Sequence, residues 1–363
     1  MEKVKVGIIG CGGIANCKHL PSLKKIPEVE LVAFCDIIPE KAESAKQNFG
    51  NENSKVYTDY RELLADPEIT VVHVLTPNVS HSPITCDALD AGKHVMCEKP
   101  MAINSAEAQK MIDAAKRNNR KLSIGYQNRH TNASLYIKRE AECGTFGDIY
   151  YAKALALRRR AVPTWGVFLE KEKQGGGPLI DIGTHALDLT LWFMNNYKPK
   201  YCIGSTFHKL NKLSVDEQGN AFGPWDVDKF DVEDSAFGMI VMENGATIML
   251  ESSWALNMLE TREAMSTICG TKAGADMYET DGVRINGVHH GSQYINKVNL
   301  ESNGVAFFDG VNDNNPGLRE ARAWIDAILY DKDPVVLPEQ AIVVTQILEG
   351  IYKSAETGEA YYF

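Results

Sequence analysis

The segment VKVGIIGCGGIA (residues 4–15) decides the fold of this chain. Residues 4–10 are mostly apolar and predict a buried strand, because strands covered on both faces of a parallel sheet read as continuous hydrophobic runs. Small residues follow as Gly10-x-Gly12-x-x-Ala15 at the start of an expected helix. This spacing allows a tight turn, close backbone approach to a diphosphate, and close packing of the helix on the strand. The segment therefore predicts a dinucleotide-binding βαβ unit.

The second expected strand ends at Asp36, which is placed to accept hydrogen bonds from an adenosine ribose. Ile37 and Ile38 follow and cannot hold a 2′-phosphate, so NAD is favoured over NADP, although Lys41 is a cation nearby. The diphosphate is expected at the helix N-terminus, where free N–H groups favour anions. A second interpretation makes Asp36 a carboxylate that caps the loop. The cofactor contacts expected here are Gly10, Gly12, Gly13, Ile14, Ala15 and Asp36.

The first 125 residues alternate short apolar runs with amphipathic stretches. Strands are expected at residues 4–10, 30–36, 70–76, 94–99 and 121–125, and helices at 13–26, 39–49, 59–66, 79–91 and 103–118. Apolar strands that alternate with helices predict a parallel sheet covered on both faces. We therefore expect an NAD-binding Rossmann domain at 1–125.

The pattern changes after residue 126. Longer strand-like segments are expected at 148–160, 235–255, 265–270, 274–279 and 293–300, and helices at 178–195, 317–330 and 338–356. The segment 235–255 predicts a hairpin, because Asn244-Gly245 suits its turn. Long strands with local turns predict a mostly antiparallel sheet open on one face. The chain is thus expected to be α/β, with an α+β domain at 126–363 for substrate binding and oligomerisation.

Composition limits the function classes. The 363 residues carry a formal net charge of −10, which argues against a nucleic-acid surface, since such surfaces need clustered cations. No apolar run approaches membrane-spanning length, and the first residues enter a strand directly, so a cytoplasmic protein is expected. The eight cysteines form no CxxC pair, which favours buried structural thiols.

Three further motifs follow in order: TPNVSH (76–81), EKP (98–100) and DIGTHALD (181–188). Together with GCGGIA (10–15), they resemble the Gfo/Idh/MocA family of oxidoreductases, named for glucose–fructose oxidoreductase and inositol dehydrogenase. The resemblance covers essentially the whole chain. It implies cofactor contacts at Thr76, Pro77, Asn78, His81, Glu98 and Lys99, and a catalytic set of Lys99, Asp181 and His185. It also implies a Lys99–Pro100 bond of a kind often cis in the family.

Two segments narrow the resemblance. RRRAVPTWGVF (158–168) and QGGGPLIDIGTHALDLTLW (174–192) are similar to a subgroup that acts on the sugars of glycosides. Members of this subgroup oxidise the glucosyl C3 hydroxyl, and some of them begin bacterial C-glycoside cleavage. The resemblance therefore implies an NAD-dependent sugar or glycoside dehydrogenase. Relatives are dimers, tetramers or larger, so a homo-oligomer through the open sheet face is expected.

The residue types suit this chemistry. Transfer of a hydride from a carbinol carbon requires a base for the hydroxyl proton and stabilisation of the developing alkoxide. His185 has the intrinsic pKa of such a base, and Lys99 can donate to the alkoxide. Asp181 lies four residues before His185, on the same helical face, and can orient the imidazole or accept from a neighbouring hydroxyl. The glycines at 175–177 are expected to allow a ligand to approach this helix.

Other residues are expected around the substrate. Trp165 can lie against the C–H face of a sugar ring or serve interdomain packing. Some of the arginines at 158–160 can bind hydroxyls, and the expected domain junction carries Gln127 and Arg129. The expected substrate contacts are Lys99, Arg129, Arg158, Arg160, Trp165, Asp181 and His185, and Gln127 is an expected cofactor contact.

Alternatives remain open. An inositol-type polyol dehydrogenase would use the same residues, and a non-catalytic NAD-sensing regulator or a redox-assisted glycosidase are further possibilities. Asp181 and His185 could also share a metal ion with His289 or His290, but no third ligand is evident, so no metal is expected. No nucleic-acid or membrane partner is expected.

Overall fold

The computed structural model describes residues 3–279, 282–300 and 315–363. The backbone divides into two units: Met1–Gln127 with Asn315–Ile342, and Asn128–Asn314 with Val343–Phe363. The sequence pattern predicts that the whole of 126–363 belongs to the second domain. The structure differs, because residues 315–342 belong to the first unit.

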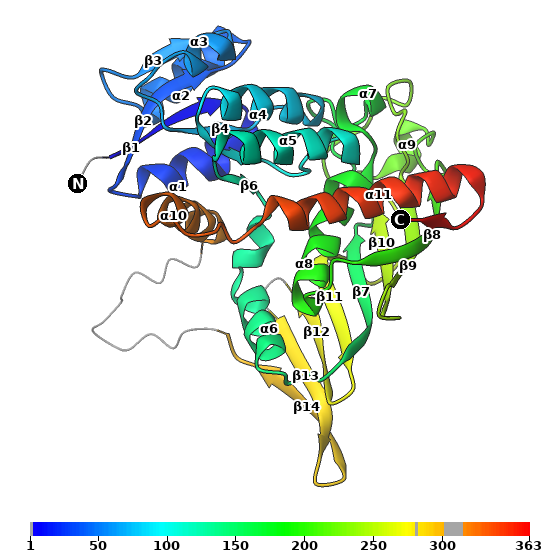
Figure 1. Cartoon of the computed structure of the whole chain (residues 1–363). Coiled ribbons are helices and arrows are strands. Elements are labelled where there is room, and N and C mark those ends of the chain that lie inside the picture. The colour runs from blue at the N-terminus through cyan, green and yellow to red at the C-terminus, as the bar shows by residue number, and fades with distance from the viewer. Residues whose placement is uncertain (1–2, 280–281, 301–314) are drawn as a thin grey trace, which may run out of the picture. The chain divides into compact units, whose positions relative to one another are not determined.

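The first unit contains a parallel sheet of six strands: β1 (Val4–Ile9), β2 (Val29–Cys35), β3 (Lys55–Tyr57), β4 (Val71–Val74), β5 (His94–Cys97) and β6 (Leu122–Ile124). Their order is β3-β2-β1-β4-β5-β6 (Figure 1). The chain therefore winds outward in one direction from β1 and in the other from β4. Ligands of doubly wound sheets bind at the carboxyl ends of the strands beside such a switch point, which is where the glycine loop follows β1. The predicted parallel sheet is confirmed.

Helices and helical turns connect these strands: η1 (Ala15–His19), α1 (Leu20–Lys24), α2 (Pro39–Phe49), α3 (Tyr60–Leu64), η2 (Asn78–Ser80), α4 (His81–Asp90) and α5 (Ser105–Asn118). The first of them, η1, is a π-helical segment rather than the α-helix that the sequence predicts. The π form occurs mostly as single turns, frequently at functional sites.

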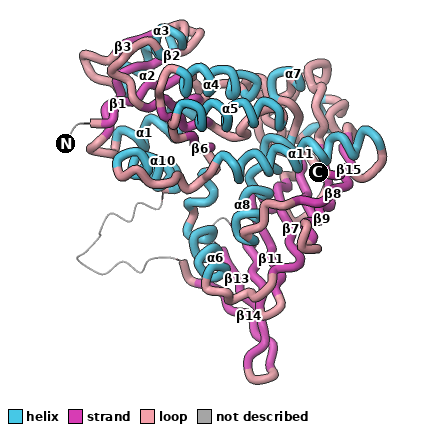
Figure 2. The backbone as a smooth tube through the Cα atoms, viewed as in Figure 1, coloured by secondary structure: helices cyan, strands magenta, loops and turns pink. Residues whose placement is uncertain are grey.

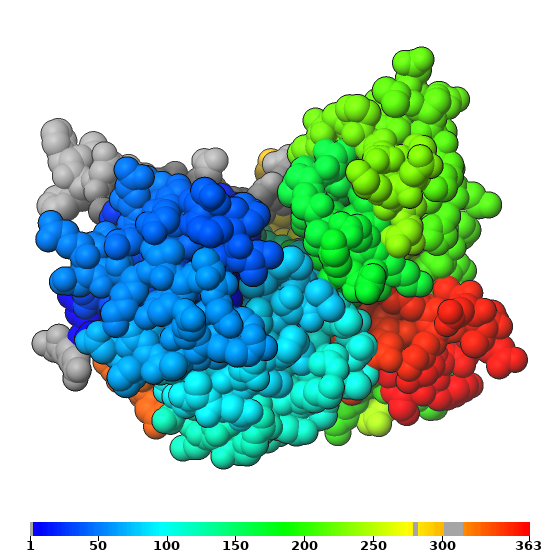
Figure 3. Space-filling model, turned by 90° about the horizontal axis from the view of Figure 1, so that it is seen from above, coloured from blue at the N-terminus to red at the C-terminus, as the bar shows by residue number. Residues whose placement is uncertain are grey.

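The helix α10 (Pro316–Leu329) completes the first unit and lies beside α1 (Figure 1). Its residues Ala321, Trp324 and Ile325 are buried in one cluster with β1 and α1. Their spacing of three and one places them on one helical face. The surface of α10, orange in the space-filling view, adjoins the blue and cyan surface of this unit (Figure 3). An apolar stripe predicts that a helix packs, but not against which sheet, and this explains the difference in the domain boundary.

The second unit contains a sheet of nine strands: β7 (Ile149–Leu157), β8 (Pro199–Phe207), β9 (Ser235–Met242), β10 (Thr247–Ser253), β11 (Arg262–Gly270), β12 (Ala273–Glu279), β13 (Gly282–His289), β14 (Ser292–Val298) and β15 (Tyr361–Tyr362). Their order is β14-β13-β12-β11-β7-β10-β9-β8-β15. All pairs are antiparallel except β7 with β10. The mostly antiparallel sheet and the hairpin of β9 and β10 are confirmed.

The helices of this unit include α6 (Asn132–Glu142), α7 (Lys171–Gln174), η4 (Leu179–Gly183), α8 (Thr184–Met194) and α9 (Val215–Gln218). The long helix α11 (Pro338–Thr357) contributes its residues from Val343 onward. The helix α8 packs against β7 and β11 (Figure 2). The helix predicted at 178–195 is therefore two pieces, a π-helical turn followed by an α-helix.

None of the helices in the described ranges is long and apolar enough to cross a membrane.

Candidate active site

The glycine loop after β1 has the constraints that its motif predicts. Gly10 has φ +94, and a Cβ there would lie 2.6 Å from the carbonyl oxygen of Leu75. Only glycine therefore fits this turn. A Cβ on Gly12 or Gly13 would meet nothing within 4 Å, so this part of the loop faces open space, whereas Ala15 is fully buried. The loop can thus admit a diphosphate at its open side while it packs tightly on the other.

Asp36 closes the same loop. Its Oδ2 accepts a hydrogen bond from the backbone N–H of Cys11 at 2.9 Å, and its Oδ1 accepts from the N–H of Ile38 at 2.9 Å. The capping contact considered as an alternative is therefore present. Each carboxylate oxygen can accept more than one hydrogen bond, so these contacts leave acceptor capacity for a ribose hydroxyl.

The segment after β4 presents a second group of predicted cofactor contacts. Pro77 is exposed, Asn78 is buried, and the Oγ1 of Thr76 is buried without a hydrogen-bond partner among the described residues. His81 joins this segment to the next one: its Nε2 lies 2.8 Å from the Thr76 carbonyl, and its Nδ1 lies 2.7 Å from the Pro100 carbonyl. Burial lowers the pKa of His81, and a neutral ring can donate to only one carbonyl at a time.

The segment Glu98-Lys99-Pro100 follows β5, and its Lys99–Pro100 bond is cis. Glu98 is buried: its Oε1 lies 2.6 Å from Lys18 Nζ and 2.8 Å from His19 Nε2. Its Oε2 accepts from the backbone N–H of Lys99 at 3.0 Å. Burial opposes ionisation, but the charge of Lys18 and the contact with His19 hold the pKa of Glu98 well below its ordinary value. The Glu98 carboxylate is therefore bound by side-chain and backbone groups of the protein.

In the second unit, Asp181 lies in the π-helical turn η4, and His185 follows at the second residue of α8. Asp181 is 7% exposed, and its Oδ2 accepts from the indole N–H of Trp254 at 3.0 Å. His185 is half-buried. Because a π turn holds more residues than an α turn, the α-helical spacing assumed for Asp181 does not apply across this junction.

A buried carboxylate fixes the start of this segment. Glu233 accepts hydrogen bonds from the backbone N–H groups of Gly177 at 2.9 Å and Leu179 at 3.2 Å, and from the hydroxyl of Tyr352 at 2.7 Å. A Cβ on Gly176 would lie 2.0 Å from the Tyr352 hydroxyl. The predicted role of the glycines at 175–177 changes accordingly: Gly176 and Gly177 admit protein groups rather than a ligand.

Arg129 requires a correction. Its side chain is 0% exposed, and it forms a two-point ion pair with Asp188 at 2.9 and 2.6 Å. Its guanidinium also lies 5.3 Å from the centre of the Trp192 ring. A guanidinium so enclosed holds α8 in place and is not presented to a substrate, contrary to the prediction. Both oxygens of Asp188 are engaged by Arg129 in this pair.

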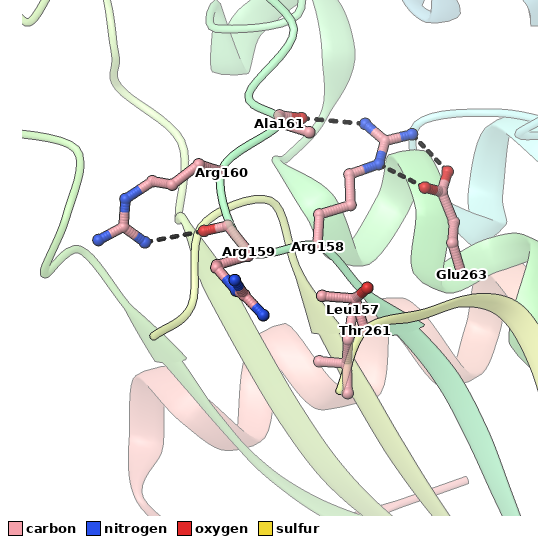
Figure 4. A pocket seen from close by; sticks show the side chains of 7 residues that line it. All are labelled: Leu157, Arg158, Arg159, Arg160, Ala161, Thr261 and Glu263. Carbon is pink, nitrogen blue, oxygen red and sulfur yellow. Dashed lines mark hydrogen bonds and ion pairs between the residues drawn. The ribbon is translucent and has the colours of Figure 1, made fainter. Parts of the chain in front are cut away.

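The predicted arginines line a pocket beyond the end of β7 (Figure 4). The pocket is lined by Leu157, Arg158, Arg159, Arg160, Ala161, Thr261 and Glu263. Arg158 points toward Glu263 and binds both of its oxygens, with Nε at 2.7 Å from Oε2. Arg160 points the other way and donates to the Arg159 carbonyl and to the side chain of Asn257 at 2.6 Å. Burial opposes the positive charge of Arg158, but the carboxylate of Glu263 and, less strongly, that of Asp181 raise its pKa above the ordinary value.

Trp165 is 53% exposed, and aromatic contacts connect it to Asp181. Its ring lies 5.8 Å from that of Phe168 and 4.9 Å from that of Phe222, both edge to face. Phe168 in turn lies 6.5 Å from Trp254, the donor to Asp181. An exposed ring supported by neighbouring rings is suited to contact a ligand.

Several of these residues had no signal in the sequence. Gln127, an expected cofactor contact, begins the 3-10 turn Gln127–His130 and is half-buried. Trp254, Glu233 and Lys18 were missed, because their partners are distant in the chain. Within the described ranges, no group of three His, Cys, Asp or Glu side chains is placed to hold a metal ion. His289 and His290 lie against each other, with ring centres 4.0 Å apart.

Comparison with known proteins agrees with this geometry. Residues 4–126 match the family model of the oxidoreductase family with an NAD-binding Rossmann fold, and residues 138–362 match its C-terminal alpha/beta domain. D-glucoside 3-dehydrogenase of Escherichia coli is 34% identical over 358 residues, which is 98% of this chain and 96% of that protein. Levoglucosan dehydrogenase of Pseudarthrobacter phenanthrenivorans is 30% identical over 273 residues, 70% of this chain and 68% of that protein.

A solved structure shares the fold. A levoglucosan dehydrogenase in complex with NADH superposes with a TM-score of 0.83 at 23% identity, with 99% of each chain covered. The family models together span nearly the whole chain, and the resemblance stated from the motifs is confirmed. The chain belongs to the Gfo/Idh/MocA family of NAD-binding oxidoreductases.

Proposed function

We propose that the protein oxidises a secondary hydroxyl, at C3, of a sugar or glycoside, with NAD as the hydride acceptor. The observation that carries the proposal is the segment of the second unit in which Trp254 donates to Asp181 and His185 is the second residue of α8. The name of the E. coli relative, a D-glucoside 3-dehydrogenase, supports the C3 position. A polyol substrate would use the same residues.

In this proposal the residues of the first unit hold the cofactor. The open side of the glycine loop at Gly12 and Gly13 would receive the diphosphate, and Asp36 would accept from the ribose. The hydroxyl of Thr76, which has no hydrogen-bond partner within the described ranges, would be satisfied by the bound group. NAD, when bound, accepts the hydride.

The chain's own residues manage the proton. The hydroxyl proton of the substrate passes to a ring nitrogen of His185 as the carbinol C–H electron pair leaves with the hydrogen. Lys99 donates to the developing alkoxide, and Asp181, oriented by Trp254, accepts from a neighbouring hydroxyl. The exposed ring of Trp165 would lie against the C–H face of the sugar, and Arg158 would line the same region. A homo-oligomer through the open sheet face stays a prediction.

A product analysis tests this function. The purified protein is incubated with NAD and, separately, with glucose, methyl β-D-glucoside, an aryl C-glucoside and myo-inositol, and products are identified by mass spectrometry. We expect glycosides that have lost two hydrogens and carry a ketone at C3, whether or not NADH accumulates. Oxidised inositol alone would move the protein to the polyol dehydrogenases. No product from any substrate, with NAD bound, would favour the regulator alternative.

Replacing Asp36 with asparagine is expected to weaken NAD binding about tenfold, because a hydrogen bond to a charged acceptor contributes about 1.5–3 kcal/mol. Binding of NADP should not weaken, because its anionic 2′-phosphate cannot donate to the Asp36 carboxylate and is repelled by its charge. The affinities can be measured by titration calorimetry. Asp59→Asn is a matched control, since Asp59 also accepts a backbone N–H, that of Arg61, at 2.9 Å. Equal losses for both nucleotides would remove Asp36 from the ribose role.

A further inference from the structure

A network of five titratable side chains lies buried inside the first unit. Lys18 Nζ bridges two carboxylates, Glu98 Oε1 at 2.6 Å and Glu320 Oε2 at 2.8 Å. His19 contacts Glu98 at 2.8 Å through Nε2 and His73 at 3.1 Å through Nδ1. The side chains of Lys18, Glu98 and Glu320 are 7%, 7% and 4% exposed. Burying so many ionisable groups is costly unless they pair and hydrogen-bond well with one another.

The two carboxylates are not equivalent. Glu98 contacts both Lys18 and His19, and its pKa lies well below its ordinary value despite burial. Burial raises the pKa of Glu320, which the charge of Lys18 only partly opposes, and its Oε1 has no hydrogen-bond partner in the described part of the chain. Burial also lowers the pKa of His73 and favours its neutral form. Glu98 is therefore the ionised centre of the network, and Glu320 supports it from the far side of Lys18.

The network joins three elements that bear on the proposed reaction. Lys18 and His19 lie in η1, directly after the glycine loop, and Glu320 lies on α10. Glu98 precedes Lys99, and its second oxygen accepts the Lys99 backbone N–H at 3.0 Å. The position of Glu98 thus constrains the backbone of the proposed catalytic lysine.

We propose that Lys18 and Glu320 are positioning residues that fix Glu98 and, through its bond to the Lys99 backbone, hold Lys99 for alkoxide stabilisation. The inference rests on the proposed function for its catalytic consequence, but its structural part stands on this unit alone. An ion pair that served only stability could be replaced by an uncharged pair without effect on Lys99. A positioning network cannot, because the carboxylate that binds the Lys99 N–H is itself held by Lys18.

The test uses Glu320→Gln, which keeps the shape of the side chain and replaces the carboxyl group that binds Lys18 with an amide. We expect kcat to fall about tenfold or more, since small misplacements of a catalytic group are costly, while the affinity for NAD stays within about twofold of wild type. Amide hydrogen exchange with NAD bound, read by mass spectrometry, should show faster exchange at the Lys99 N–H. This second readout needs no turnover, so it tests the positioning even if the proposed substrates fail.

The control is Glu28→Gln, which breaks a different ion pair of α10, between Glu28 and Arg322 at 2.9 Å. Both of those side chains are about one-third exposed, whereas the carboxylates of the network are buried. This variant should leave kcat and Lys99 exchange unchanged. If Glu320→Gln does not fold, Glu320→Asp keeps the charge but shortens the reach, and a smaller change in the same direction is expected. Unchanged exchange at Lys99 in the folded variant would overturn the proposal, as would a loss confined to NAD affinity.

Discussion

Replacing His185 with alanine is expected to lower kcat about a thousandfold, while the affinity for NAD stays at the wild-type value. A positioned general base contributes about 10²- to 10⁴-fold to a reaction that removes a proton, and alanine offers no replacement. NAD affinity should persist because the glycine loop and Asp36, which we propose bind it, belong to the first unit, whereas His185 belongs to the second. The measurements are steady-state kinetics on the best substrate of the product analysis and fluorescence titration with NADH.

An exposed histidine of the same unit provides the control. His208 follows the end of β8 and is exposed, so His208→Ala should change neither kcat nor NAD affinity. If His185→Ala keeps a tenth of the wild-type kcat or more, His185 is not the base. A loss of NAD affinity together with kcat would instead indicate that His185 supports cofactor binding.

Strands were predicted well where they are buried on both faces, because such strands are mostly apolar in sequence. Strands covered on both faces are apolar throughout, so β1, β2 and β4 were recognised, and Pro39 marks the start of α2 as predicted. The strand β3 has three residues, too few for any periodicity. In β8, polar residues and a glycine interrupt the apolar positions, so the sequence shows no clear strand pattern and the strand was missed.

The candidate site was predictable to the extent that it depends on the backbone. Gly10 must be glycine because of its turn, and such constraints can be read from spacing. The partner of a side chain cannot be read in this way: Arg129 is predicted to contact the substrate, but it pairs with Asp188, which lies 59 residues further along the chain. The π turn before His185 was also invisible, because helical periodicity assumes a constant number of residues per turn.

Replacing Gly177 with alanine is expected to lower the free energy of unfolding by about 3 kcal/mol or more. The new Cβ would lie 2.2 Å from the backbone carbonyl oxygen of Glu233, and a backbone atom cannot turn aside as a flexible side chain can. Overpacking alone costs about 1–3 kcal/mol. Any shift of the loop also breaks the Gly177 N–H bond to Glu233, and a buried carboxylate that loses a donor adds about 1–3 kcal/mol.

Urea denaturation followed by tryptophan fluorescence measures this effect, because four of the five tryptophans belong to the second unit. Gly13→Ala is the control: its Cβ would meet nothing within 4 Å, so unfolding should change by no more than about 0.5 kcal/mol. The same loop displacement would move Asp181, whose backbone N–H donates to the Gly177 carbonyl at 3.0 Å. Any folded Gly177→Ala protein should therefore also turn over more slowly than wild type. Wild-type stability in this variant would mean that Glu233 yields to the methyl group and does not fix the start of the segment that carries Asp181.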